Sequence, residues 1–134
     1  MLSNKSVPRQ VVADLRAAAL SSGRYDLMVT EYAYPLTVYI GDQQHQFAGP
    51  DDVWAFYQSF HSAMNAQGYD RMTARVTAED LPRAGRFRVW TEWFGEGSKM
   101  ARNCIAATIC YCSVVPTGVI TEMIEFTRVA LPIT

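Results

Sequence analysis

The chain has 134 residues, a formal net charge of −1 and 49% hydrophobic residues. This length is typical of one domain, and a charged share of 19%, against the usual ~25%, excludes a disordered chain. A charge this close to zero supplies no basic surface for phosphates. We therefore expect one domain over residues 1–134 and no nucleic-acid partner.

The chain shows no targeting, membrane or metal signal. The first residues lack the 7–15-residue apolar segment of a signal peptide, and no apolar run approaches the ~20 residues of a membrane span. Cys104, Cys110 and Cys112 are odd in number and have no histidine near them in sequence. We expect reduced thiols, no metal, no cofactor, no membrane partner and a cytoplasmic protein.

Helical periodicity dominates the first half of the chain. A helix is predicted over residues 7–21, with Ser6 as its N-cap, and a shorter one over residues 25–32. A third helix is predicted from Pro50 to the glycine at position 68, because apolar residues recur there at helical spacing. The apolar stripe of the first helix is predicted to consist of Val12, Leu15 and Ala19.

The period then changes to two, which is typical of half-buried strands. A short hairpin is predicted over residues 36–47, and four strands over residues 71–78, 87–94, 101–115 and 119–129. Helices followed by an antiparallel meander indicate the α+β class.

Four segments in this order resemble the nuclear-transport-factor-2-like superfamily, which includes ketosteroid isomerases and SnoaL-like polyketide cyclases. They are Ser22-Gly-Arg-Tyr-Asp26, Tyr34-Pro-Leu-Thr-Val-Tyr-Ile-Gly41, the segment from Phe47 to Phe56, and Thr117-Gly-Val-Ile-Thr-Glu-Met123. The resemblance implies N-terminal helices packed in the concave face of a strongly curved, mixed or antiparallel sheet. It also implies a cone-shaped pocket and a homodimer formed through the outer sheet face.

The chain departs from the isomerase pattern at both acidic positions. Ile40 stands where the resemblance places an aspartate base, and Ile109 stands near the second acid. The first hypothesis is therefore a pocket protein that binds an apolar, oxygenated small molecule without catalysis. The alternative is a cofactor-independent acid–base enzyme, an isomerase, cyclase or dehydratase.

Three residues are candidates for proton transfer in that alternative. Glu122 alternates with Ile120 and Ile124 on one side of the last strand, and burial raises the pKa of a carboxyl group. A one-residue slip would turn Glu122 outward, and pairing with an arginine is the other alternative. His61 borders the apolar stripe of the third helix. Asp42 lies two residues after Ile40, where the resemblance places the aspartate base.

The same alternation predicts the pocket wall and the dimer face. Cys104, Ala106, Thr108, Cys110 and Cys112 are predicted to face outward and to pack against a second copy. The competing interpretation is a monomer whose residues 131–134 cover that face. The predicted pocket residues are Tyr32, Tyr39, Phe56, Tyr57, Phe60, Val89, Ile109, Tyr111, Ile120 and Ile124.

Overall fold

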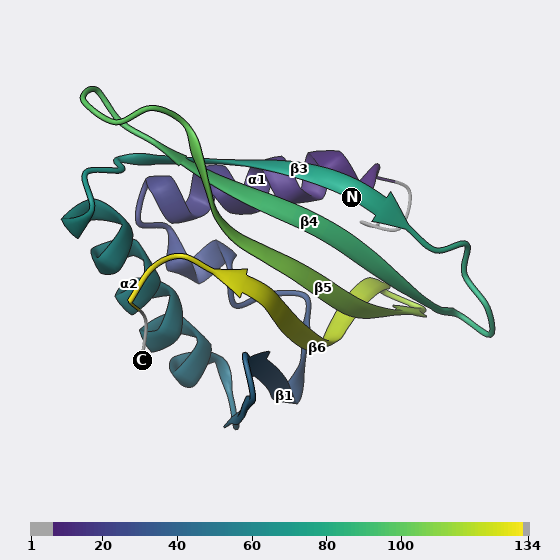
Figure 1. Cartoon of the computed structure of the whole chain (residues 1–134). Coiled ribbons are helices and arrows are strands. Elements are labelled where there is room, and N and C mark those ends of the chain that lie inside the picture. The colour runs from purple at the N-terminus through teal and green to yellow at the C-terminus, as the bar shows by residue number, and fades with distance from the viewer. Residues whose placement is uncertain (1–6, 133–134) are drawn as a thin grey trace.

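A computed structural model describes residues 7–132, so the predicted N-cap at Ser6 and residues 133–134 lie outside the described part (Figure 1). Within residues 7–132, two helices, one short 3-10 turn and six strands follow one another. In order they are α1 (Arg9–Ser21), η2 (Tyr25–Leu27), β1 (Tyr32–Ile40), β2 (Gln43–Phe47), α2 (Pro50–Ala66), β3 (Arg71–Glu79), β4 (Arg86–Glu96), β5 (Asn103–Val115) and β6 (Gly118–Val129).

The six strands form one curved sheet in the order β2-β1-β6-β5-β4-β3. β1 and β6 run parallel, and all other neighbours are antiparallel, so the sheet is mixed. Figure 1 shows α1 running along β3 and α2 crossing the end of the sheet where β1 and β6 lie. Side chains from both helices meet those of the central strands in one core. The predicted α+β fold is confirmed.

The predicted helix over residues 25–32 is wrong. Only Tyr25–Leu27 forms a single 3-10 turn, and β1 already begins at Tyr32. A helix this short has little stability without a packed face, and β1 is rich in tyrosine and β-branched residues, which favours a strand. Glu31 breaks the chain direction in between, with a left-handed backbone at φ 67°.

The predicted buried stripe of α1 is wrong at Leu15, whereas Ala19 is buried as predicted and Val12 is half-buried. Leu15 is 64% exposed, whereas Ala13, Ala17 and Leu20 are buried. These three lie at spacing i, i+4, i+7, which is one face of a helix. Arg16 lies on this same face, because it follows Ala13 by three residues and precedes Leu20 by four. Two alanines let the helix approach the sheet closely, and the arginine lies in the space that remains.

A β-bulge at Glu122 reverses the sides of β6 part-way along the strand. Cys112 pairs with Thr121, but the neighbouring Tyr111 pairs with Met123, so Glu122 is the extra residue. Thr121 is buried before the bulge, and Ile124 is buried after it. The expectation that Glu122 and Ile120 face inward with Ile124 is wrong for this reason.

The sides of β5 are the reverse of the expected ones. Ala106, Thr108, Cys110 and Cys112 are buried on the inner side of the sheet. Ile109 and Tyr111 alternate with them and therefore lie on the outer side. The predicted outer face of small residues is thus an inner face, where small side chains leave room for the helices.

Two turns meet closely at one end of the sheet. A Cβ atom added to Gly97 would lie 2.2 Å from the carbonyl oxygen of Gly68, and the Asp70 amide donates to the Glu96 carbonyl at 3.0 Å. Glycine at position 97 is therefore required by this backbone contact.

None of the helices within residues 7–132 is long and apolar enough to cross a membrane.

Candidate functional site

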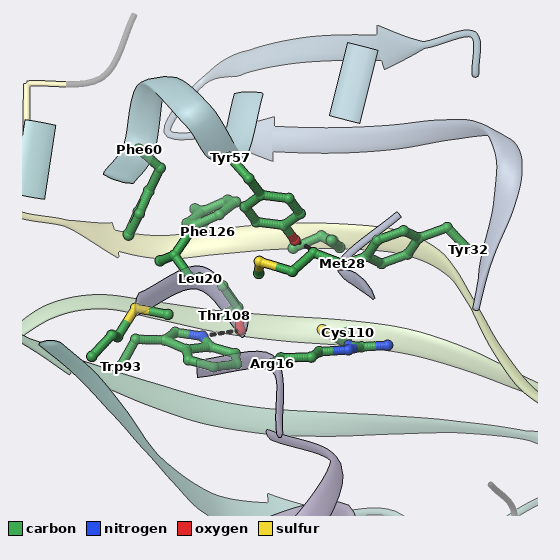
Figure 2. Close-up of a pocket in the computed structure, with 12 residues that line it drawn as sticks. Arg16, Leu20, Met28, Tyr32, Tyr57, Phe60, Trp93, Thr108, Cys110 and Phe126 are labelled. Carbon is green, nitrogen blue, oxygen red and sulfur yellow. Dashed lines mark hydrogen bonds between the residues drawn. The ribbon is translucent and has the colours of Figure 1, made fainter. Parts of the chain in front are cut away.

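A small cavity lies between α1, α2 and the inner face of the sheet (Figure 2). Its volume is about 40 Å³. A single water needs roughly 10–15 Å³ of such space, so the cavity holds a few atoms as it stands. Its lining residues are Arg16, Leu20, Met28, Tyr32, Tyr57, Phe60, Met72, Trp93, Thr108, Cys110, Ile124 and Phe126.

Arg16 is the one charged side chain among these lining residues. Its side chain is 18% exposed, and its guanidinium carbon lies 5.2 Å from the ring centre of Tyr32. Its ion-pair partner is Glu31, with 3.7 Å between Nη2 and Oε2. An arginine side chain carries five N–H donors and stays charged in proteins. Within residues 7–132 the Arg16 guanidinium donates no hydrogen bond, so its N–H groups are available to a ligand.

Two tyrosines supply neutral polar groups to the same cavity. The hydroxyl groups of Tyr32 and Tyr57 lie 2.7 Å apart and hydrogen-bond to each other. Burial raises the pKa of both phenols, so both stay protonated near neutral pH. One of the two donates to the other, and the second O–H can donate to a ligand. Burial likewise raises the pKa of Cys110, which keeps its thiol neutral.

A second, more polar chamber adjoins the first and shares part of its wall. The two chambers share Arg16, Trp93 and Cys110, and the second has a volume of about 30 Å³. Arg9, Glu31 and the hydroxyl-bearing Thr91 and Thr121 contribute to its wall. We call the two together the cleft. Arg16 therefore separates an apolar chamber from a polar one.

Trp93 and the methionines shape the apolar chamber. The indole N–H of Trp93 donates to Thr108 Oγ1 at 2.9 Å, which fixes the ring against the wall. Met28 and Met72 line the chamber with unbranched thioethers. Methionine side chains adapt their shape easily, so this part of the wall can yield to a longer ligand.

The structure brings part of the predicted pocket together. Tyr32, Tyr57, Phe60 and Ile124 line the apolar chamber, and Val89 lines the polar one. That they contact a ligand stays a prediction. Five other predicted residues lie elsewhere. Phe56 packs on Phe47 and Phe126, Tyr39 lies beside Glu125 in the outer rows of the sheet, and Ile109, Tyr111 and Ile120 lie on the outer side.

The three candidate acid–base residues do not line the cleft. Glu122 accepts a hydrogen bond from the Ser113 hydroxyl and lies in an outer groove with Arg86 and Arg88. His61 is hydrogen-bonded through Nδ1 to the Tyr25 hydroxyl, and burial lowers its pKa. Asp42 is exposed in the turn between β1 and β2. The bulge turns Glu122 to the outer side of the sheet. His61 lies at the edge of the apolar face of α2 and therefore outside the cleft.

Sequence reasoning missed Arg16 because a charged residue on a helix is normally assigned to the solvent side. The signal that was present is the triplet Ala13, Ala17 and Leu20, which marks the buried face and includes Arg16 between its members. No group of three potential metal ligands converges among the residues that the structure describes.

Neither a protein-family model nor a curated protein sequence matches the chain. Solved structures do. A domain of unknown function with a cystatin-like fold from Nostoc punctiforme has a TM-score of 0.71 at 10% identity, over 96% of this chain and 79% of the other. An NTF2-like protein with a cystatin-like fold from Novosphingobium aromaticivorans has a TM-score of 0.66 at 10% identity, over 92% and 80%. The chain has an NTF2-like, cystatin-like fold.

A third solved structure is similar over nearly the whole chain. A putative calcium/calmodulin-dependent protein kinase type II association domain from Thiobacillus denitrificans has a TM-score of 0.67 at 15% identity, over 94% of this chain and 97% of the other. At identities this low, the structural likeness shows the fold alone. It says nothing of activity, because one fold hosts many functions. The function must be argued from the cleft.

Proposed function

We propose that this NTF2-like protein binds a small carboxylic acid with an apolar body in the cleft, without catalysis. The observation that carries the proposal is Arg16, a guanidinium in the wall of an otherwise uncharged and mostly apolar cavity. A carboxylate accepts two parallel N–H bonds from such a fork. The Tyr32–Tyr57 pair supplies a further donor, and the apolar chamber holds the body of the ligand.

The free cavity volume favours a short ligand. About 40 Å³ is far below the 300–1,000 Å³ typical of sites for drug-sized molecules. Two to four carbons beyond the carboxylate fill the apolar chamber once Met28 or Met72 changes rotamer. The chemical consequence is a length limit, beyond which added methylenes no longer gain affinity. Three free cysteines are in keeping with a cytoplasmic location, which is part of the proposal.

A titration with linear acids tests the proposal. We expect saturable shifts of cleft amide signals in NMR spectra with acetate through hexanoate, and weaker binding of the matching neutral amides. Arg16→Met should weaken butanoate binding by about 10- to 100-fold, since a hydrogen bond to a charged group contributes about 1.5–3 kcal/mol. Arg16→Lys keeps the positive charge but loses the paired N–H donors, so its butanoate affinity should lie between those of the wild type and Arg16→Met. Equal binding of butanoate and butanamide would contradict the proposal.

The acid–base alternative has less support. Among residues 7–132, the cleft wall contains Glu31 as its carboxylate and no histidine, and Glu31 belongs to the polar chamber. The tyrosines of the apolar chamber stay protonated and act as donors, not bases.

We also propose that the protein forms a homodimer through its outer sheet face. The rows Trp90–Ile109–Glu125 and Arg88–Tyr111–Met123 cross this face on three neighbouring strands. Its apolar members are half-buried in one chain, which is typical of an interface core ringed by charges. One similar solved structure is a putative association domain, which is in keeping with an association role for this fold.

Sedimentation equilibrium at micromolar concentration tests the dimer. We expect about twice the chain mass of 15.0 kDa. Ile109→Arg should produce a monomer, because it places an unpaired charge in the contact. Leu81→Arg, at an 88% exposed loop position, is the control that should stay dimeric. A wild-type mass near 15 kDa refutes the dimer. Ala106, which the sequence pattern placed on this face, is fully buried inside the chain, so a substitution there would not test the contact.

A further inference from the structure

We infer that Glu31 is an internal competitor for the ligand: its carboxylate occupies Arg16 in the empty protein and is exchanged for the ligand's carboxylate on binding. This inference rests on the proposed function and adds the residue that sets its affinity. It is carried by three observations, namely the distance of the ion pair, the backbone of Glu31 and the charge balance of the cleft.

The ion pair is loose enough to be exchanged. The Arg16 and Glu31 side chains are 18% and 38% exposed, and their nearest charged atoms are 3.7 Å apart. A hydrogen-bonded guanidinium–carboxylate pair is closer, at about 2.7–2.9 Å. Glu31 therefore balances the charge of Arg16 without using its donors, and a carboxylate that reaches hydrogen-bonding distance gains contacts that Glu31 does not make.

The backbone keeps Glu31 at this rim of the cleft. Its φ of 67° lies in the left-handed region, which is unusual for a residue with a side chain. Its carbonyl oxygen accepts the Thr121 amide of β6 at 2.7 Å. Thr121 itself lines the polar chamber. Such a conformation persists where the surroundings fix it. The backbone therefore keeps Glu31 at the rim, while its side chain, 38% exposed, can turn away from Arg16.

The charges of the cleft make exchange more favourable than addition. Arg9, Arg16 and Glu31 are its charged lining residues, which leaves one surplus positive charge. The Arg9 guanidinium also donates to the Val7 carbonyl at 2.9 Å. An anion that binds while Glu31 stays in place meets a like charge at Arg16. If Glu31 turns outward, the carboxylate of the ligand interacts with the positive charge of Arg16 without competition from Glu31.

Butanoate affinity is measured in four variants. They are Glu31→Gln, Arg16→Met, the double variant and a net-charge control, Asp70→Asn. Asp70 is exposed in the turn after α2, so its substitution removes the same charge away from the cleft. Glu31→Gln should bind butanoate about three- to tenfold more tightly, while Asp70→Asn stays near wild type. In the Arg16→Met background, Glu31→Gln should have no such effect.

The outcomes separate the two proposals. If Arg16→Met removes the preference for butanoate over butanamide but Glu31→Gln leaves the affinity unchanged or lowers it, the competitor role is refuted and the carboxylate site stands. If Arg16→Met leaves the preference intact, or no acid binds, the proposed function is refuted and the competitor role with it. Thermal melts confirm that each variant is folded, and Glu31→Asp serves as a second variant if Glu31→Gln is not.

Discussion

Replacing Leu20 by alanine should cost about 2–5 kcal/mol of unfolding free energy and enlarge the apolar chamber. Leu20 is fully buried on the sheet-facing side of α1 and lines the cavity beside Met28 and Trp93. Removing its side chain loses the transfer free energy of the deleted atoms and leaves a larger space. Because that space joins an existing cavity, we expect the tight length limit for bound acids to shift upward, with hexanoate gaining over butanoate.

Leu15→Ala is the matched control, since it makes the same change on the same helix at a 64% exposed position. Its expected effect is within about 0.5 kcal/mol. Urea denaturation followed by circular dichroism measures both variants. Equal losses for the two would show that the buried face of α1 is not the one described here.

Replacing Gly97 by alanine should destabilise the fold by about 1–3 kcal/mol or more. The added Cβ would meet the Gly68 carbonyl oxygen at 2.2 Å, and the atoms it meets belong to the backbone, which cannot rotate away. The turn after α2 and the end of β4 must move apart. The hydrogen bond from the Asp70 amide to the Glu96 carbonyl is the first contact to be lost.

Ser98→Ala, at an exposed position in the same loop, should leave the stability near that of the wild type. Hydrogen exchange at the Asp70 amide gives a local measurement beside the denaturation curve. Unchanged protection of that amide in Gly97→Ala would contradict the expected separation of the two turns.

The order of the elements was predictable because each has a strong period of its own. The spacing of Phe56, Phe60 and Met64 marks α2, and a first turn with Pro50 and two aspartates marks its start. The alternation in β3 and β4 likewise identified both strands, with Val89 and Trp93 on the inner side. These signals are local, so one sequence is enough to find them.

The sides of α1, β5 and β6 were not predictable in the same way. Periodicity fixes which residues share a face, but it does not say which face meets the core when both faces contain apolar residues. In β5, Ile109 and Tyr111 alternate with Thr108 and Cys110, and the larger pair lies outside because the helices need room inside. Arg16 was missed for a related reason. An arginine on a helix is normally placed on the solvent side, and here that choice leaves out the one charged residue lining the apolar chamber.

The extra residue at Glu122 also decides how this chain is aligned with its structural relatives. A relative whose last strand is regular has one residue fewer there, so an ungapped comparison equates outward residues of one protein with inward residues of the other on one side of the bulge. At identities of 10–15%, the letters themselves do not reveal the shift. Equivalent side chains should therefore be assigned from superposed strands, with a one-residue gap at Glu122 wherever the other strand is regular at that point.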